Sequence, residues 1–178
     1  MFKEERAEYL FDWKMLGDIN EGRPNLGVLM HLHAYRLLQF VIRDVLIKES
    51  GVEKANEIIY KAGELAGREI FKNVITKKEN YGEFVQELQG VLLNLKIGIL
   101  RLEKEDLENL EFVLTVAEDL DCSGVPVCDE RICTYDEGLI SGLLQEFTGK
   151  KFTVKEVDCW CSGGRICRFV AKAQQLEK

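Results

Sequence analysis

The C-terminal third of the chain, residues 133–169, constrains the fold most strongly, because it spaces potential metal ligands around a helix and a hairpin. Directly after Cys133, Thr134 and Glu137 match a capping box, which predicts a helix N-terminus there. Apolar residues then recur at helical spacing as far as a glycine at 149, which suits the left-handed position beyond a helix end. We therefore predict one amphipathic helix starting beside Cys133.

A β-hairpin is predicted after this helix. Residues 152–158 and 165–171 alternate between apolar and polar side chains, and Ser162-Gly163-Gly164 separates them as a turn. If the turn centres on the middle glycine, Cys159 lies opposite Cys167. Directly opposed residues hold their Cβ atoms roughly 4.5–5.5 Å apart, so both thiolates can reach one ion.

Glu156 is unusual within the first of these strands. It shares the pleat phase of Phe152 and Val154, so its carboxylate points where apolar groups point. A carboxylate in that position needs a cation or a hydrogen-bond donor, or its pKa rises. In a straight strand Glu156 and Cys159 face opposite ways, so we expect the strand to bend, bulge or end near Asp158.

The four potential ligands form a three-sulfur, one-oxygen set of Cys133, Glu156, Cys159 and Cys167. Such a set suits tetrahedral zinc. All four positions would be filled by protein, and a closed site of this kind is structural rather than catalytic. The alternative is a buried acid that lies near unrelated free thiols.

These residues also carry a resemblance to a known family. The motif CxYxxGxxxG, followed by ExxCxxxGxxxC, resembles the C-terminal signature of the vinyl-4-reductase domain; its residues here are Cys133, Tyr135, Gly138, Gly142, Glu156, Cys159, Gly163 and Cys167. That family includes the sensor domains of phenol- and toluene-responsive bacterial activators, and proteins linked to bacteriochlorophyll vinyl reduction. At fold level it is similar to haem-based nitric oxide sensors and to subunits of a Golgi tethering complex. The likeness extends from about Leu26 and is specific over 133–169.

The resemblance implies a zinc site and a ligand site. In the aromatic-sensing members the equivalent Cys, Glu, Cys, Cys set binds a structural zinc, which assigns the metal to the four ligands named above. Those sensors place their ligand near the positions of Phe84, Leu88, Phe112 and Leu114, which would line a pocket here or form plain core. A histidine and a tryptophan hold the phenolic hydroxyl in those sensors, whereas this chain has phenylalanines, so we expect an apolar or aromatic ligand.

The rest of the chain predicts helices first and strands later. Helices are expected over residues 3–17, 26–48, 52–74 and 81–96, and strands over 97–103 and 110–116. Helix 26–48 is the most apolar and is expected to be central to the core, and Gly63 and Gly67 are expected to let a neighbouring backbone approach closely. This order predicts an α+β fold, with N-terminal helices on one face of a roughly four-stranded antiparallel sheet. Residues 1–24 would be a leader helix and linker, and residues 25–178 the binding domain.

Three further cysteines remain outside the predicted ligand set. Cys122 and Cys128 flank Gly124 and Pro126 in a loop-like segment, and Cys161 lies within the hairpin turn. These thiols could build a second metal site, extend the first, form a redox-sensitive disulfide, or have no function.

Composition limits the functional classes. The 178 residues are 46% hydrophobic and 31% charged, which fits one soluble domain. The net charge of −7 argues against direct binding to nucleic acid or an anionic membrane. No signal peptide or membrane span is visible, so a cytoplasmic protein is expected. In that compartment six cysteines favour metal or redox chemistry over a disulfide framework.

We therefore expect a free-standing sensor or carrier domain for a small apolar or aromatic molecule, with structural zinc. Two alternatives stay open. The first is a catalytic or accessory component of a tetrapyrrole vinyl reductase, and the second is a thiol redox sensor or zinc-dependent protein-interaction module. Catalysis is less favoured because the sequence lacks a dinucleotide fingerprint, a P-loop and HExxH. We also expect a homodimer, formed through the leader helix or an apolar helix face, and a separate regulatory or enzyme partner.

Overall fold

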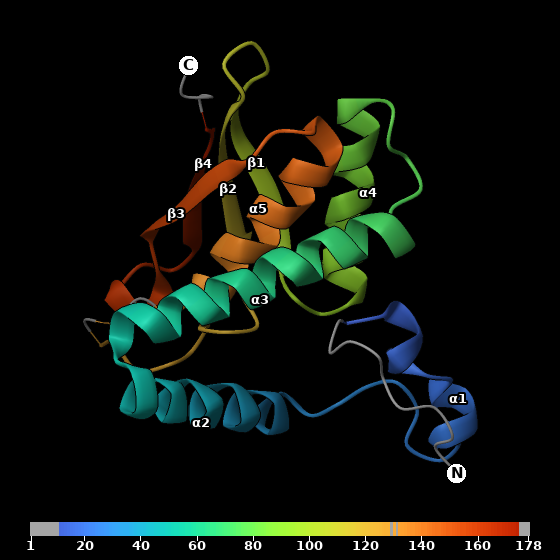
Figure 1. The fold of residues 1–178 in the computed structure, drawn as a ribbon, viewed down its shortest axis with the longest axis vertical. Coiled ribbons are helices and arrows are strands. Elements are labelled where there is room, and N and C mark those ends of the chain that lie inside the picture. The colour runs from blue at the N-terminus through green and yellow to red at the C-terminus, as the bar shows by residue number, and fades with distance from the viewer. Residues whose placement is uncertain (1–10, 129, 131, 175–178) are drawn as a thin grey trace.

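The computed structural model describes residues 11–128, 130 and 132–174, and within them the chain forms an α+β fold (Figure 1). The antiparallel strands are β1 (Ile99–Asp106), β2 (Glu111–Ala117), β3 (Phe152–Asp158) and β4 (Cys167–Ala173). They form one sheet in the order β1-β2-β4-β3. The predicted fold class is confirmed.

The main helices are α2 (Leu32–Ser50), α3 (Val52–Asn73), α4 (Tyr81–Asn94) and α5 (Thr134–Thr148). Figure 1 shows α4 and α5 against one face of the sheet, α3 crossing over α5, and α2 on the far side of α3. The core lies between the sheet and its covering helices, and it includes Phe84, Leu143 and Phe169, all buried. Three short turns of helix complete the described structure: Trp13–Leu16, α1 (Ile19–Gly22) and Trp160–Ser162.

Helices α3 and α5 pack backbone against backbone. A Cβ atom added at Gly63 would collide with the carbonyl oxygen of Tyr135, and one at Gly138 with that of Tyr60. Gly67 and Gly142 meet the opposite backbone in the same way. The predicted close approach at Gly63 and Gly67 is confirmed, and its partner surface is the glycine pair of α5.

The predicted central position of helix 26–48 is wrong. The helix begins at Leu32, and Arg43 is its one fully buried residue. Leu37 and Leu38 remain 68% and 60% exposed. The physical reason is geometric: α2 contacts the body of the fold chiefly through α3, while α3, α4 and α5 already occupy the space over the sheet.

The predicted leader helix 3–17 is shorter in the described residues. Its first part, residues 3–10, lies outside them. Beyond that part only Trp13–Leu16 is helical, as a single turn whose N-terminus is capped by Asp12, and Gly17 follows with a positive φ. Among the described helices, none combines the length and the apolar character needed to cross a bilayer.

Candidate metal centre and adjoining pocket

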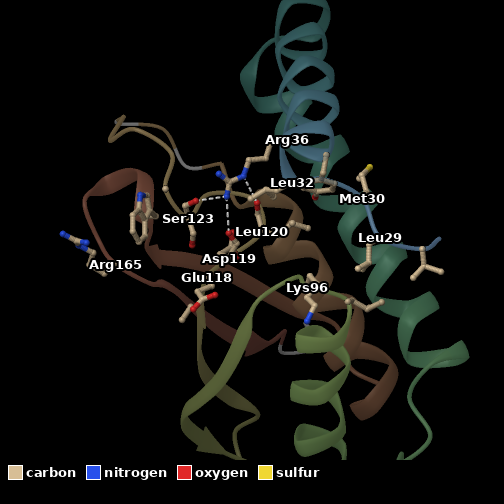
Figure 2. Close-up of a pocket in the computed structure, with 16 residues that line it drawn as sticks. Leu29, Met30, Leu32, Arg36, Lys96, Glu118, Asp119, Leu120, Ser123 and Arg165 are labelled. Atoms are coloured by element: carbon tan, nitrogen blue, oxygen red, sulfur yellow. Dashed lines mark hydrogen bonds between the residues drawn. The ribbon is translucent and has the colours of Figure 1, made fainter. Parts of the chain in front are cut away.

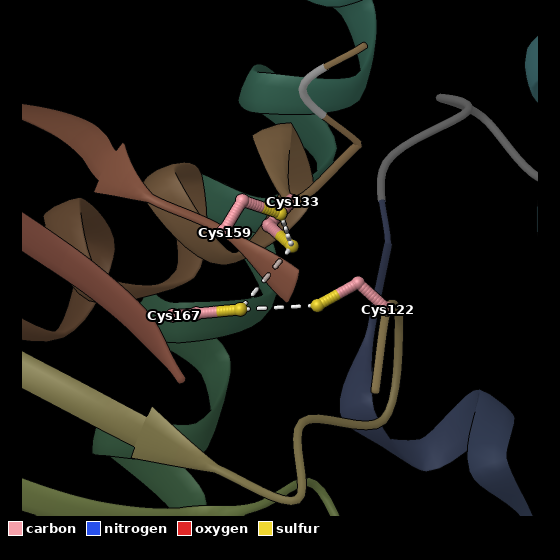
Figure 3. Close-up of side chains that lie close together, drawn as sticks. All are labelled: Cys122, Cys133, Cys159 and Cys167. Atoms are coloured by element: carbon pink, nitrogen blue, oxygen red, sulfur yellow. Dashed lines mark hydrogen bonds between the residues drawn. The ribbon is translucent and has the colours of Figure 1, made fainter. Parts of the chain in front are cut away.

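Four buried thiols gather at one end of the sheet (Figure 3). Cys122 comes from the loop after β2, Cys133 caps α5, Cys159 follows β3, and Cys167 begins β4. The Sγ of Cys133 lies 3.8 Å from that of Cys159 and 3.8 Å from that of Cys167. Cys122 Sγ lies 3.0 Å from Cys167 Sγ. The cluster therefore ties two loops to the start of a helix and the start of a strand.

The spacing of three of these thiols fits a tetrahedral metal ion. Metal–sulfur bonds of about 2.3 Å in a tetrahedron separate the sulfur atoms by about 3.8 Å. The distances from Cys133 Sγ to the sulfur atoms of Cys159 and Cys167 both agree with this value. All four sulfurs lie within 4.8 Å of one another, so the group could hold one ion.

The expected irregularity in β3 is present. The pairing between β3 and β4 shifts register between Glu156 and Asp158, which is a β-bulge. As a result Glu156 and Cys159 are both buried, whereas the two residues between them are exposed. The bulge therefore turns Glu156 and Cys159 towards the same interior.

Glu156 lies beside the thiol cluster without belonging to its group of four. The residue is 2% exposed, and neither carboxylate oxygen has a hydrogen-bond partner in the described part of the chain. Burial, with the nearby Cys159 thiol, raises the pKa of Glu156 to about 8. A buried carboxylate without a donor is strongly destabilising unless a proton or a cation neutralises it. Glu156 thus stays a predicted ligand, and Cys122 is a candidate donor that the predicted set did not include.

The thiols also influence one another electrostatically. Hydrogen bonds from Cys122, Cys133 and Cys167 lower the pKa of the Cys159 thiol, which favours its thiolate. The pKa of Cys133 is raised, first by its hydrogen bond to Cys122. The thiolate is the form that binds metal, so this environment favours metal binding by Cys159.

Buried aspartates surround the turn that carries Cys122. Asp119 Oδ1 accepts hydrogen bonds from the backbone N–H groups of Asp121 and Cys122, at 2.9 and 3.0 Å. Burial raises the pKa of Asp121 to about 7 and that of Asp136 well above its ordinary value. Asp119, Cys133 and Asp136 form a second group whose ligand atoms lie close together. Sequence reasoning missed these acids, although Asp121 directly precedes Cys122 and Asp119 lies three residues before it.

The predicted capping box at the start of α5 is not formed. Cys133 is the N-cap residue and makes no side-chain cap hydrogen bond. Glu137 instead accepts a hydrogen bond from the backbone N–H of Glu156 at 2.8 Å, and one from Lys155 at 3.2 Å. This carboxylate links α5 to β3 next to the cluster, a tertiary contact that replaces the local cap.

Cys128 and Cys161 lie outside the group of four. The backbone N–H of Cys128 donates to the carbonyl oxygen of Cys161 at 2.8 Å, so their two loops lie side by side. Cys161 is buried and Cys128 half-buried, and both are free thiols. Of the three additional cysteines, Cys122 extends the first cluster.

A pocket of about 790 Å³ opens beside the Cys122 turn (Figure 2). Arg36 of α2 donates from Nε to the carbonyl oxygen of Leu120, and from Nη2 to that of Ser123, each at 2.8 Å. Tyr35 donates its hydroxyl proton to Asp121 Oδ1 at 2.8 Å. The lining combines apolar side chains with a few charged ones; it includes Leu29, Met30, Leu32, Leu120, Trp160, Arg36, Lys96 and Arg165.

The four residues predicted to line a ligand pocket, Phe84, Leu88, Phe112 and Leu114, are all buried in the core. Phe84 stacks on Phe147 with ring centroids 4.4 Å apart, and Phe112 stacks on Tyr81 at 5.6 Å. A space of only about 30 Å³ touches Leu88 and Leu114. The structure thus brings these residues into a nearly filled interior, which matches the plain-core alternative.

Residues 112–173, which run from β2 to β4 and include all four clustered thiols, match the model of the vinyl-4-reductase domain. The predicted recognition of a domain of this type is confirmed for this segment. An uncharacterized protein of Methanocaldococcus jannaschii is 28% identical over 161 residues, covering 90% of this chain and 88% of the relative.

Solved structures share the fold. A vinyl-4-reductase family protein from Methanocaldococcus jannaschii aligns with a TM-score of 0.65 at 20% identity, covering 95% of this chain and all of that one. The phenol-responsive sensory domain of the transcription activator PoxR, solved with phenol, also gives 0.65, at 18% identity, covering 82% of this chain and 76% of that one. A trafficking protein particle complex subunit 3 from Naegleria fowleri, covalently bound to palmitic acid, gives 0.59 at 12% identity, covering 83% and 99%.

Proposed function

We propose that this protein is a sensor or carrier domain for a small apolar or aromatic molecule, stabilised by a zinc ion. The observation that carries the proposal is the vinyl-4-reductase domain match over residues 112–173, the segment that supplies every thiol of the cluster. The fold neighbours support it, because one was solved with phenol and another with palmitic acid. The residues that line the pocket lie between positions 28 and 165 of the sequence. This range supports a binding domain over about residues 25–178.

The metal centre has a structural role in this proposal. Cys133, Cys159 and Cys167 would hold the ion, with Glu156 or Cys122 as the fourth donor. A zinc ion with four protein ligands contributes folding free energy and leaves no position for substrate. The ion would fasten the β3–β4 hairpin to the first turn of α5.

The pocket beside the Cys122 turn is the ligand site that we propose. Apolar side chains such as Leu29, Met30 and Leu120 would contact the body of the ligand, and Arg36 or Lys96 a polar end. Ligand sites generally combine an apolar lining with a few polar groups in this way. The nearly filled interior beside Leu114 offers far less room, about 30 Å³.

A thermal-shift screen of hydrocarbons, phenolics and porphyrins tests this function. A ligand that binds only the folded state stabilises it by about 2.7 kcal/mol at a hundredfold excess over Kd. We expect at least one compound to raise the melting temperature, and Leu29→Asp in the pocket to reduce that shift. Leu107→Asp, an exposed leucine away from the pocket, is the matched control and should keep the shift.

The outcomes of the screen separate the two sites. If Phe112→Ala removes the shift while Leu29→Asp does not, the ligand occupies the interior and the pocket assignment is wrong. If no compound stabilises the protein, the small-molecule function itself fails.

The partner that we propose is a second copy of the chain. The outer face of α2 exposes Leu37, Leu38 and Val41, and an apolar groove of about 340 Å³ runs between α2 and α3. An exposed helix face of this kind gains stability when another apolar surface covers it. We also propose a reducing, cytoplasmic setting, because all six cysteines are free thiols and one cluster requires thiolates.

A further inference from the structure

The cluster offers more donors than a tetrahedral ion can use. Four thiols lie within 4.8 Å of one another, and the bulge in β3 turns the buried carboxylate of Glu156 towards the same interior, whereas a tetrahedral site binds four ligands. Cys133 Sγ lies at the spacing of such a site from the sulfur atoms of both Cys159 and Cys167, and these three donors leave one position for the other two. We propose that Cys122 and Glu156 exchange at this fourth position and that the adjoining pocket controls the exchange. This inference rests on the proposed metal centre.

Cys122 is held near the ion by a separate turn. Its Sγ lies 3.0 Å from Cys167 Sγ, which is closer than the tetrahedral edge of about 3.8 Å. A small outward movement of the turn would bring Cys122 Sγ to the sulfur–sulfur distance of a tetrahedral site. A larger movement would take this sulfur out of reach of the ion. Asp119 Oδ1 holds the turn through the N–H groups of Asp121 and Cys122, so the turn can move as one unit.

Glu156, in contrast, is fixed in the sheet. Its backbone N–H donates to Glu137 Oε1 of α5 at 2.8 Å. In the sheet, Glu156 of β3 pairs with Phe169 of β4. Both carboxylate oxygens are buried without a partner in the described residues. The carboxylate therefore has no competing partner among the described residues when the turn withdraws its thiolate.

The pocket reaches the turn through α2. Arg36 donates to the carbonyl oxygens of Leu120 and Ser123, which flank Cys122, and Tyr35 donates to Asp121. Arg36, Leu120 and Ser123 also line the pocket (Figure 2). A ligand with an apolar body and a carboxylate or similar acceptor would compete for the guanidinium of Arg36. Arg36 also donates to the carbonyl oxygen of Asp119 at 3.4 Å, and losing its hydrogen bonds would leave the turn held to α2 by Tyr35 and so freer to move.

The proposed ligand exchange conserves protons and charge and involves no oxidation or reduction. Either the thiolate of Cys122 or the carboxylate of Glu156 would hold the fourth position, each with one negative charge, and the donor that is not bound would take up the proton that the other gives up. The charge on the ion and on the site is unchanged, and only the ligand set alters, from four sulfurs to three sulfurs and one oxygen.

Cobalt(II) in place of zinc tests the exchange, because the intensity of thiolate-to-cobalt charge-transfer absorption counts the bound thiolates. The full chain would be compared with Cys122→Ser, Glu156→Gln and the double variant. We expect Cys122→Ser to keep one cobalt per chain and to lose about a quarter of the intensity, one thiolate of four. Glu156→Gln leaves Cys122 as the donor for the fourth position, so its intensity should equal or exceed that of the wild-type chain. The double variant should lose cobalt affinity by at least about tenfold relative to either single variant.

Several results would overturn the exchange. Wild-type intensity in Cys122→Ser would show that Cys122 is never a ligand, and loss of cobalt from that variant alone would show that Glu156 cannot replace it. If Cys122→Ser does not fold, protection of four rather than three thiols against alkylation in the zinc-loaded wild-type chain decides the same point. Failure of the wild-type chain to bind cobalt at all would instead contradict the metal centre of the proposed function.

The link to the pocket has its own variant. Arg36→Gln removes the guanidinium donors to the turn, and we expect the charge-transfer intensity to fall towards that of Cys122→Ser. Arg101→Gln, an exposed arginine on β1, is the control and should match the wild-type chain. An unchanged spectrum in Arg36→Gln would show that α2 does not control the turn.

Discussion

Helices α5 and α2 are both rich in apolar residues, yet they occupy opposite situations in the fold. Nine residues of α5 are buried, among them Leu139 and Leu143, whereas in α2 the one buried residue is Arg43. The difference follows from small residues rather than from hydrophobicity. Gly138 and Gly142 let α5 lie between the sheet and α3, while α2 has no such glycine surface and contacts chiefly α3 and the turn that carries Cys122. Apolar composition indicates that a helix is stabilised by burial. Glycines that allow close backbone packing determine which helix lies in the interior.

The largest expected effect is at the glycine contact. Gly138→Leu would drive a side chain into the carbonyl oxygen of Tyr60, so α3 and α5 must separate. We expect the free energy of unfolding to fall by about 3 kcal/mol or more, measured by chemical denaturation. Gly90→Ala in α4 is the control, because a Cβ there meets no atom within 4 Å. It should stabilise the protein by roughly 0.5–1 kcal/mol. Equal effects at the two positions would contradict the packing account.

The metal ligands at the N-terminus of α5 should show the next largest effect. Cys159→Ser removes a thiolate from outside the position that Cys122 and Glu156 share, so we expect the melting temperature to fall about 5 °C further than in Cys122→Ser, where Glu156 can substitute. Differential scanning calorimetry of the zinc-loaded variants measures this difference. Removing zinc with a chelator should make the two variants converge. Equal melting temperatures before chelation would show that the two cysteines are equivalent.

The outer face of α2 should show the smallest effect on folding. Leu38→Glu replaces a leucine that is 60% exposed, so the free energy of unfolding of the monomer should change by less than about 0.5 kcal/mol. The same variant should abolish the proposed homodimer, which sedimentation velocity at micromolar concentration detects. Leu107→Glu, exposed in the β1–β2 connection, serves as the control and should leave the dimer intact. A wild-type monomer at that concentration would refute the dimer.

Local patterns predicted much of the fold. The strand alternation placed Glu156 with Phe152 and Val154, and the structure buries all three. The conflict between Glu156 and Cys159 in a straight strand predicted the irregularity that the register shift reveals. The glycine spacing in α3 predicted a close helix neighbour. Each of these inferences depends on a short stretch of chain, where periodicity is a direct consequence of backbone geometry.

Longer-range features were not predictable from such patterns. The position of α2 depends on which helices occupy the space over the sheet. Its apolar composition suggested a central position, which is wrong. Cys122 approaches Cys167 only because a loop after β2 folds back, and no periodicity specifies a loop path. The capping box failed because Glu137 bonds to β3 instead of to its own helix. In all three cases a tertiary contact overrode a local preference.

Native mass spectrometry of the full chain, purified without chelators, tests the central claim that a thiol-bound metal ion stabilises this fold. The four buried thiols and the unpartnered Glu156 carboxylate predict one zinc ion per chain, retained in Cys122→Ser and lost in Cys133→Ser. A wild-type chain that carries no transition metal, and that melts at the same temperature with and without added zinc, would contradict the account.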